Sequence, residues 1–335
     1  MPPAIEPSPS ALKLIAERHH LAAAADLVKA PTQGVANHVY FLGEHLVLRI
    51  ARPEPHFVAD LRKEADVIPV VEQLGVRTPA LVDFDDSCGL IDTPYMILQR
   101  VTGATPAIPK HPVTAPWGRV YRDLGADLAR LHSANLTPAD LPRVPVDERG
   151  DPRVGIANLA SSGHISTDAA AWLTAWLDHL AHYLPDQPQF RLLHGDASPT
   201  NLLADTETTQ LRAVIDWGDA AWADPAMDFA KLPLRAVTYA LQGYLDGATA
   251  DTHTAWSARV LRHHLSWALF RIAKPPNPDE ATWNAQPASR LLDIMRFYLD
   301  GPPDPWRGLY LAPPVTDHDL HGPDAVNAHQ HFPAH

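Results

Sequence analysis

Residues 194–216, which read HGDASPTNLLADTETTQLRAVID, decide how this part of the chain folds and what chemistry it can support. They place a carboxylate at Asp196, an amide five residues later at Asn201, and a second carboxylate at Asp216 after an apolar run. Phosphoryl transfer from a nucleotide uses such a set, because one carboxylate orients the attacking hydroxyl while an amide and a carboxylate hold the Mg²⁺ on the phosphates. The apolar runs 201–204 and 211–215 predict a β-hairpin that sets Asp216 at a strand end.

The spacing of these residues is more informative than the tripeptide HGD, which alone fits a turn with a capping aspartate equally well. An Asp-x-x-x-x-Asn loop can return so that both side chains face one metal–phosphate centre. The strand that follows aims a further carboxylate at a cleft, since functional residues gather on loops at strand ends. The three residues together therefore favour phosphoryl transfer.

Runs of β-branched and aromatic residues predict a strand-rich N-terminal region. A hairpin turn is expected at Gly43-Glu44, and residues 11–29 predict helical pieces. Residues 57–74 predict a helix, in which Pro69 predicts a kink or an early end. The expected strands are 39–42, 45–50, 81–84 and 95–100.

Two charged residues are out of place in this region. Arg49 lies inside the apolar run VLRI, and Glu64 lies on the apolar face of the 57–74 helix, where an unpaired carboxylate would be costly. We expect them to pair, because kinase-like sites use a basic strand residue and a helix glutamate at the α- and β-phosphates. An edge-strand arginine pointing to water is the alternative for Arg49.

The segment QGVANH at 33–38 precedes the first of these strands and is a candidate loop for covering the nucleotide phosphates. Gly34 and Asn37 are its candidate contacts. A single glycine is a weak signal. The chain has no G-x-x-x-x-G-K-[ST] run, which argues against a P-loop enzyme.

Helical periodicity dominates beyond residue 102, which predicts a division into lobes. We expect a nucleotide-binding lobe at 1–102 with a loose leader at 1–10, and a hinge or connector at 103–110. A helical lobe with the catalytic loop and the acceptor site should span 111–300, and a Pro- and His-rich tail, irregular or wrapped on the surface, should span 301–335. The expected helices are 119–133, 169–184, 225–243, 254–273 and 286–299.

The composition indicates a globular protein and disfavours several partners. The 335 residues are 46% hydrophobic, and the formal net charge of -12 disfavours nucleic acid and anionic membranes. The single cysteine, Cys88, excludes an internal disulfide. We expect no transmembrane helix, no signal peptide and a cytoplasmic location, since no apolar run approaches ~18 residues. The oligomeric state stays open.

Three segments resemble the aminoglycoside/macrolide phosphotransferase family: HGD at 194–196 with Asn201, IDWGDA at 215–220, and DPAMDFA at 224–230. The resemblance spans roughly residues 30–300. It implies an α+β, protein-kinase-like fold with a small β-rich N-lobe and a larger, mainly helical C-lobe. It also implies ATP or GTP as co-substrate, Mg²⁺ as cofactor, and transfer of the γ-phosphate to a hydroxyl of a small-molecule acceptor.

The resemblance assigns roles to the residues of the central motif. Asp196 stands at the position of the catalytic base, and Asn201 and Asp216 stand at those of the metal ligands. Asp228 is implied to be structural, tying the loop after the metal site back to the catalytic loop.

The resemblance also assigns nucleotide contacts in the first lobe. Arg49 stands at the phosphate contact, where many members have Lys, and Glu64 at its helix partner. Because Arg is a planar fork rather than a point charge, a different phosphate geometry is expected. Gln99, Arg100 and Val101 match the hinge that hydrogen-bonds the nucleotide base.

Other residues admit alternative interpretations. The 19 histidines invite metal binding, but His19-His20 and His263-His264 are adjacent pairs that do not share a helix face, and the tail histidines are expected to be solvated. His132 is expected to pack or to cap a helix. The tryptophans expected in the core are Trp172, Trp176 and Trp267. Trp217 and Trp222 fit either the core or the substrate side. Asp219 and Asp224 fit either helix caps or the attraction of a cationic substrate.

The leading hypothesis is a small-molecule O-kinase that acts on an antibiotic, in resistance or self-resistance. The acceptor would be a macrolide, an aminoglycoside or another hydroxylated natural product. A metabolite kinase for a sugar, a choline-like amine or an amino alcohol is the alternative, and fold alone does not choose between them. A catalytically silent nucleotide-binding protein is disfavoured by the intact set of Asp196, Asn201 and Asp216, and metal storage through the histidines is the most distant hypothesis.

Overall fold

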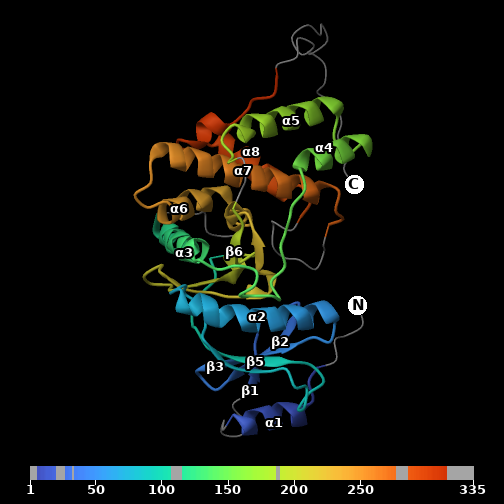
Figure 1. Ribbon diagram of the computed structural model, residues 1–335, viewed down its shortest axis with the longest axis vertical. Helices are drawn as coiled ribbons and strands as arrows, with labels where there is room; N and C mark the ends of the chain where they lie inside the picture. The colour runs from blue at the N-terminus through green and yellow to red at the C-terminus, as the bar shows by residue number, and fades with distance from the viewer. Residues whose placement is uncertain are drawn as a thin grey trace, which may run out of the picture.

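The structure, a computed structural model, describes residues 6–19, 27–31, 34–106, 115–185, 189–276 and 286–314. It has two lobes, stacked along the long axis of the molecule (Figure 1). The lower lobe in that view holds a small antiparallel sheet, and the upper lobe is mainly helical. The predicted α+β architecture of two lobes is confirmed.

A five-stranded antiparallel sheet forms the N-terminal lobe, with the spatial order β1-β2-β3-β5-β4. A turn at Gly43 joins β2 to β3, and its φ of 58° suits glycine. This turn confirms the predicted hairpin, which sets Val39 opposite Arg49. The strands are β1 (Leu27–Lys29), β2 (Asn37–Leu42), β3 (Leu46–Ala51), β4 (Leu81–Asp85) and β5 (Tyr95–Gln99).

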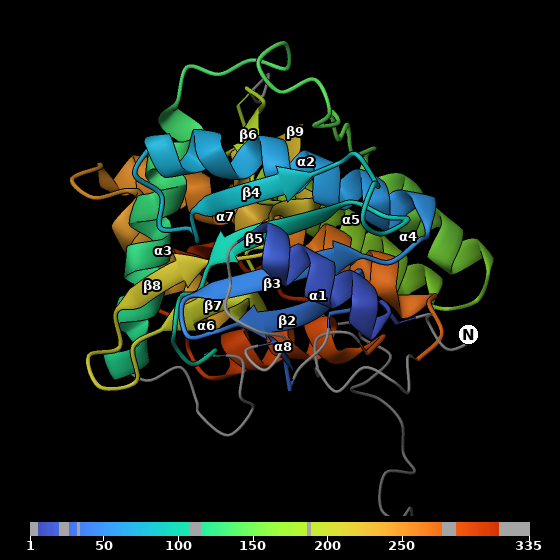
Figure 2. The ribbon, with the colours of Figure 1, turned by 90° about the horizontal axis from the view of Figure 1, so that it is seen from below.

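The side chains of this sheet alternate between two faces. The outer face, which includes Leu48, packs on α1 (Pro9–Arg18) through the buried Ile15, and Figure 2 shows α1 in front of the sheet when it is seen from below. The inner face carries Arg49. Helix α2 (Pro55–Gln73) lies between this sheet and the helical lobe in Figure 1, so the inner face looks toward the junction of the lobes.

Two expectations for the helices of this lobe need correction. The early end predicted at Pro69 is wrong, because α2 continues to Gln73 with Ile68 and Val71 buried, and this packing offsets the hydrogen bond that proline cannot donate. The helical pieces predicted over 11–29 are right for α1 and wrong at 27–29. That short run pairs with β2 as an edge strand, and pairing outweighs its weak helical preference. Residues 20–26 lie outside the described residues.

The described part of the upper lobe contains six α-helices, of which α7 crosses the middle of the lobe in Figure 1. Helices α3 and α6 pack with their backbones in contact, since a Cβ on Gly125 would lie 1.9 Å from the carbonyl oxygen of Ala240. The helices are α3 (Ala115–Ser133), α4 (Pro152–Ser161), α5 (Thr167–Ala181), α6 (Leu234–Tyr244), α7 (Ala250–Ile272) and α8 (Ser289–Leu299).

Four of the five predicted helices of this lobe are confirmed with shifted ends, and α4 was not predicted. The helix predicted at 225–243 is only partly right. Pro225–Phe229 forms a short 3-10 helix, η4, and α6 begins only at Leu234. Asp224 caps η4, and Pro233 cannot continue a helix from the preceding turn, so two short helices replace one long one.

Two short strand pairs carry the central motif. β7 (Leu202–Ala204) pairs with β8 (Leu211–Val214), which confirms the predicted hairpin, and β6 (Arg191–Leu193) pairs with β9 (Ala221–Ala223). The chain entering from the first lobe joins this hairpin, because the backbones of Ala104 and Ala204 exchange two hydrogen bonds of 2.9 Å. Residues 107–110 of the predicted connector lie outside the described residues.

The start of the tail packs on the helical lobe. Trp306 and Leu309 lie in a short 3-10 helix, η6 (Trp306–Leu309), and are buried, so of the two alternatives for the tail the irregular one is wrong there and the one wrapped on the lobe fits. The indole N–H of Trp176 donates to the carbonyl oxygen of Leu309 at 2.8 Å and confirms that this tryptophan belongs to the core. Residues 315–335 lie outside the described residues. Among the helices of the described ranges, none combines the length and the apolar character that a membrane span needs.

Candidate functional site

The loop between β6 and β7 presents Asp196, whose carboxylate has two neighbours. The side-chain N–H of Asn201 donates to the backbone oxygen of Asp196 at 2.9 Å and to its Oδ2 at 3.0 Å. Nζ of Lys231 lies 3.0 Å from Oδ1. The loop returns on itself in the way its spacing predicts, and it brings the amide and the carboxylate together.

Gly195 makes this return possible. Its φ is 81°, and a Cβ at this position would lie 1.9 Å from the carbonyl oxygen of Asp219. Any other residue would be strained by the backbone angle and would overlap a second backbone segment. The glycine therefore lets the catalytic loop touch the turn η3 (Trp217–Asp219).

A buried hydrogen-bond network around Asp228 fixes the backbone of the loop. Its carboxylate accepts the amide N–H groups of His194 at 2.9 Å and Gly195 at 2.8 Å, and it lies 3.0 Å from Nε2 of His132. Burial alone would raise the pKa of Asp228, but the hydrogen bond from His132 leads the effects that lower it below its usual value. Asp228 thus ties the loop as implied, and His132 is its buried partner rather than a helix cap.

The side chain of His194 links the loop to the strand that leads to Asp216. Its Nδ1 accepts the amide N–H of Asp196 at 3.1 Å, so Nε2 carries the proton and donates to the carbonyl oxygen of Ile215 at 3.1 Å. Asp216 follows with a φ of 70°, a left-handed conformation that costs energy for a residue other than glycine. The network therefore holds both carboxylates of the motif on one framework.

The pair predicted in the N-terminal lobe is present and reaches a third residue. The guanidinium of Arg49 in β3 pairs with Glu64 of α2 through Nη1, and its Nη2 lies 2.9 Å from Oδ1 of Asp216 in the other lobe. Glu64 is 1% exposed and also accepts the amide N–H of Trp217 at 3.2 Å. Burial raises the pKa of Glu64. Burial would also raise the pKa of Asp216, but the positive charge of Arg49 leads the effects that lower it below its usual value.

Asn201 and Asp216 offer oxygen donors of the kind that Mg²⁺ prefers. Asp196 engages Nδ2 of Asn201, and within the described part of the chain no donor reaches the amide oxygen. Arg49 contacts only Oδ1 of Asp216, so Oδ2 can face a cation. Two protein ligands suffice when the phosphates of a nucleotide complete the coordination shell.

The histidines do not form a metal centre within the described residues, where no group of three or more His, Cys, Asp or Glu could hold a metal ion. His263 pairs instead with Asp224 at 3.0 Å, and His264 contacts the carbonyl oxygen of Phe229 at 3.0 Å. Burial lowers the pKa of His264 to about 3, which keeps it neutral. The tail histidines 318, 321, 329, 331 and 335 lie outside the described residues.

The candidate phosphate-covering loop leads into β2. Asn37 is buried at the first position of the strand, and its Oδ1 has no hydrogen-bond partner among the described residues. Gly34 is exposed, and its carbonyl oxygen accepts from Arg52 at 3.4 Å. Nothing in these contacts brings Gly34 to Arg49, so its predicted phosphate contact stays a prediction.

The predicted hinge follows β5. The amide N–H of Gln99 donates to Ala80 at 2.9 Å and that of Arg100 to His45 at 2.7 Å, so the sheet uses both. The Arg100 guanidinium covers the ring of Phe41 at 3.9 Å. Val101 is the residue of this segment whose amide N–H meets no acceptor in the described ranges, which makes it the best placed of the three to bind a nucleotide base.

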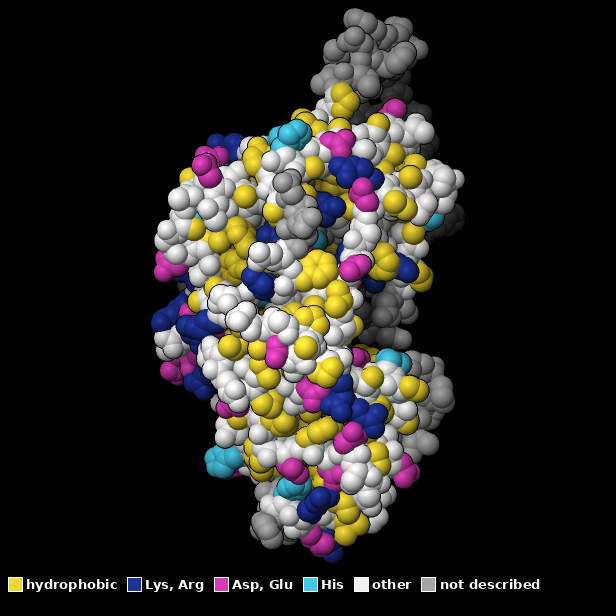
Figure 3. Space-filling model, in the orientation of Figure 1, with side chains coloured by type: hydrophobic (Ala, Val, Ile, Leu, Met, Phe, Trp, Pro, Cys, Tyr) yellow, Lys and Arg dark blue, Asp and Glu magenta, His cyan; other side chains and the backbone are white. Residues whose placement is uncertain are grey.

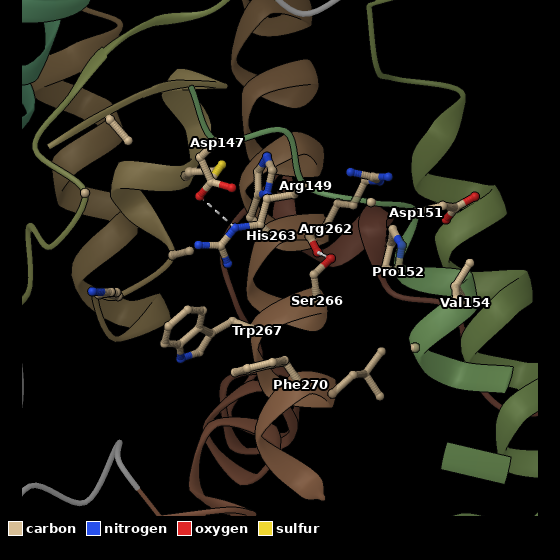
Figure 4. Close-up of a pocket in the computed structure, with 18 of the residues that line it drawn as sticks. Asp147, Arg149, Asp151, Pro152, Val154, Arg262, His263, Ser266, Trp267 and Phe270 are labelled. Carbon is tan, nitrogen blue, oxygen red and sulfur yellow. Dashed lines mark hydrogen bonds and ion pairs between the residues drawn. The ribbon is translucent and has the colours of Figure 1, made fainter. Parts of the chain in front are cut away.

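A pocket of about 1010 Å³ opens in the helical lobe beside the catalytic loop. Gly195, Asp219 and Lys231 form its wall at the catalytic end. Figure 4 shows Trp267 of α7 across from Asp147 and other residues of the segment that leads into α4. Because it adjoins Asp196 through its neighbour Gly195, this pocket is the candidate acceptor site.

The structure decides which of these tryptophans lie in the core and which role Asp224 has. Trp217 and Trp222 are buried and belong to the core, whereas Trp267 lines the pocket and the core prediction for it is wrong. Asp224 caps η4 and pairs with Arg259 at 2.8 Å, which is a structural role. Asp219 lies 3.5 Å from Lys231 at the pocket wall.

Two cations of this site escaped the sequence analysis. Lys231 follows the DPAMDFA segment and contacts Asp196, and a positive charge directly after that motif was the available signal. Arg262 lies within a long helix that mixes polar and apolar residues, where one more charged residue gives no signal. The segment 145–155 also contributes to the pocket, and no sequence pattern had singled it out within the 111–300 region.

Comparison with known proteins bears on this site. Residues 27–259 match the sequence profile described as the Phosphotransferase enzyme family. The viomycin phosphotransferase of Streptomyces vinaceus is 29% identical over 241 residues, which cover 67% of this chain and 80% of that protein. Acyl-CoA dehydrogenase family member 10 of Mus musculus is 25% identical over 209 residues, which cover 59% of this chain and 19% of that protein.

Solved structures share the fold. The GDP complex of wild-type aminoglycoside 2'-phosphotransferase-IIIa matches with a TM-score of 0.60 and 18% identity, over 85% of this chain and 96% of that one. Macrolide 2'-phosphotransferase MphH from Brachybacterium faecium matches with a TM-score of 0.52 and 21% identity, over 88% and 98%. At these identities the likeness shows the fold alone, and the predicted protein-kinase-like class is confirmed.

Proposed function

The chain belongs to the Phosphotransferase enzyme family and is a small-molecule kinase, and from this premise we propose that it moves the γ-phosphate of ATP or GTP to a hydroxyl of a hydroxylated small molecule. The observation that carries the proposal is the position of Asp196. Its carboxylate is held by Asn201 and by Lys231, and both Lys231 and the neighbouring Gly195 line the acceptor pocket.

Asp196 acts as the base in this proposal. It accepts the proton of the acceptor hydroxyl as that oxygen attacks the γ-phosphorus, a role that a positioned carboxylate can fill. The contacts from Asn201 and Lys231 fix both of its oxygens, so the carboxylate needs little reorientation before reaction. Asp228 and Gly195 fix the backbone beneath it.

The nucleotide phosphates lie between the lobes in this proposal. Arg49 contacts them from β3 and is itself oriented by Glu64 and Asp216. Asn201 and Asp216 would hold Mg²⁺, which supplies neutralisation of the charge that develops on the phosphates. Val101 is proposed to donate its amide N–H to the base, with Gln99 and Arg100 shaping the same edge.

An antibiotic is the proposed acceptor, in resistance or self-resistance, because the most extensive sequence match above is a viomycin phosphotransferase. A metabolite kinase is the second candidate. It stays open because a choline/ethanolamine kinase family protein shares the fold at a TM-score of 0.52 and 17% identity, and fold alone does not choose the acceptor. The intact contacts of Asp196 disfavour a silent nucleotide-binding protein.

The test is a screen of antibiotic classes and common hydroxylated metabolites, with ATP and GTP in parallel and Mg²⁺ present or chelated. Phosphorylated acceptors are identified by their mass. We expect acceptor-dependent turnover that needs Mg²⁺ and that falls about 10²–10⁴-fold in Asp196→Asn. Equal turnover by wild type and Asp196→Asn, or no phosphorylated acceptor in the whole screen, would overturn the proposal.

A further inference from the structure

The carboxylates of the acceptor pocket are already neutralised by the protein itself. Three aspartates line the pocket, and each has a cationic partner within 4 Å. The pairs are Asp147 with Arg149 at 3.0 Å, Asp151 with Arg153 at 3.2 Å, and Asp219 with Lys231 at 3.5 Å. Each aspartate that lines the pocket thus has a cation beside it, although Asp219 shares Lys231 with Asp196.

Two cations that line the pocket have no ion pair among the described residues, the exposed Lys274 and the partly buried Arg262. Arg262 of α7 lines the pocket and is only partly exposed. Figure 4 shows it near Asp151 and Ser266. Its guanidinium makes no hydrogen bond or ion pair with any described residue. Burial lowers the pKa of Arg262 and the positive charge of Arg153 adds to this fall, while the negative charges of Asp151 and Asp224 oppose it without a direct contact. An arginine still carries its charge at neutral pH after such a change.

The other side chains that line the pocket indicate what the rest of the ligand is like. Trp267, Phe270 and Val154 supply an apolar wall, and the ammonium group of Lys274 lies 4.6 Å from the ring centre of Phe270. An apolar group can pack there while a polar end faces the cations. The reacting hydroxyl must lie at the other end, near Asp196.

The positive charge of Arg262 in this pocket does not reflect the net charge of the whole protein. The chain has a formal net charge of -12, and Figure 3 shows acidic and basic side chains interspersed over the face drawn there. A partly desolvated arginine without a counter-ion is costly, and a bound anion would remove that cost.

We propose that Arg262 binds an anionic group of the acceptor, a carboxylate or another oxyanion, so that the kinase acts on a hydroxylated acid with an apolar body. This rests on the proposed function, since it names the acceptor class of the same site. It disfavours polycationic acceptors, which would meet Arg262 and find every aspartate of the pocket paired.

The test uses three probes of one skeleton: 3-phenyllactate, 3-phenyllactamide and 1-amino-3-phenyl-2-propanol. They share the ring and the hydroxyl and differ in carrying an anionic, a neutral or a cationic end. Binding to the full-length protein is measured by calorimetry, and phosphorylation by mass spectrometry with ATP and GTP. We expect the acid to bind at least tenfold more tightly than the amide and the amine.

Variants assign this preference to Arg262. Arg262→Met keeps much of the apolar stem and should remove the preference for the acid, whereas Arg262→Lys should keep part of it. Arg296→Met, on the exposed side of α8 and away from the pocket, is the matched control and should bind all three probes as wild type does. A preference that survives Arg262→Met would contradict the proposal, as would equal or tighter binding of the amide or amine, or no binding of the acid.

The readouts separate this inference from the proposed function. Acid-selective binding that depends on Arg262, without phosphorylation of any acceptor in the wider screen, would sustain the inference and overturn the kinase proposal. Phosphorylation of neutral or cationic acceptors that is unaffected by Arg262→Met would do the reverse.

Discussion

The catalytic loop and the acceptor pocket adjoin each other, yet they differ in whether their charged side chains have partners of opposite charge. Around the loop every functional carboxylate has partners: Asp196 contacts Lys231, Asp216 contacts Arg49, and Asp228 contacts His132. In the pocket an arginine is left without an acidic partner among the described residues. The charges of the loop hold its own geometry, whereas the pocket keeps a guanidinium that a ligand can neutralise.

The two regions also differ in where their residues come from. The loop residues lie within a short stretch of sequence, braced by a few distant side chains such as Arg49 and Glu64. The pocket draws on segments near 147, 219 and 262 that no local pattern connects. Changes in the loop should therefore affect the chemical step and stability, whereas changes in the pocket should affect which acceptor binds.

The largest combined effect on rate and stability is expected from Gly195→Ala. The new methyl group would meet the carbonyl oxygen of Asp219 and would occupy a left-handed backbone, so the loop must shift. A displacement on the scale of 1 Å costs about 10²-fold in rate, and the strain should lower the free energy of unfolding by about 1–3 kcal/mol. Steady-state kinetics with the best acceptor and urea unfolding measure the two effects.

Gly163→Ala isolates the contribution of the backbone angle. Gly163 has a φ of 74°, similar to that of Gly195, but a Cβ there would meet nothing within 4 Å. It should lose about 1–2 kcal/mol of stability and keep the wild-type kcat. If both variants had the same kcat, the close contact with Asp219 would not be what positions the loop.

Asp228→Asn should have the next largest effect, mainly on stability. The buried carboxylate accepts hydrogen bonds from His194, Gly195 and His132, and breaking such a buried pair costs about 3–5 kcal/mol. Because the folded state lowers the pKa of Asp228, its contribution is complete above the unfolded value and is lost as the pH falls through the folded one.

Urea unfolding at several pH values tests this expectation. The stability gap between wild type and Asp228→Asn should be constant from about pH 7 to 5 and should narrow below about pH 4. Asp178→Asn is the control, since Asp178 makes an exposed pair with Arg153 and should cost no more than about 1 kcal/mol. A gap that widened toward low pH would show that His132, not Asp228, controls the network.

The same division explains what the sequence could and could not predict. The return of Asn201 to Asp196 and the pairing of Arg49 with Glu64 were foreseeable, because spacing and misplaced charge are local signals. The contact of Arg49 with Asp216 joins two lobes through residues 167 positions apart, and no local signal reports it. Local patterns also predicted a strand-rich region before a helix-rich one, whereas the protein-kinase-like class was implied by the family resemblance.

The errors share a physical cause in tertiary packing. Residues 27–29 became a strand because β2 offers an unpaired edge, and α2 continued past Pro69 because its apolar face is buried on both sides of it. Trp267 lies at helical spacing like a core residue, yet its face of α7 borders the pocket. Periodicity shows that a helix has an apolar face but does not show whether protein or ligand covers it.

The smallest effect, and the one that joins the two regions, is expected from Lys231→Met. Lys231 lines the pocket and contacts Asp196, so its loss should lower kcat about tenfold, given that a hydrogen bond to a charged group is worth roughly 1.5–3 kcal/mol. The KM for the nucleotide should not change, because Arg49 rather than Lys231 faces the phosphates in the proposed site. Lys13→Met, on the exposed side of α1, is the matched control and should leave both parameters unchanged.

The separate changes in kcat and in the KM for the acceptor of Lys231→Met decide to which region this lysine belongs. A fall in kcat at constant KM for the acceptor would place it with the catalytic loop, as a residue that positions Asp196. A rise in the KM for acidic acceptors alone would place it with Arg262, as a further cation that binds the ligand. An unchanged kcat would contradict the positioning role, because the contact to Oδ1 of Asp196 would then contribute nothing to the chemical step.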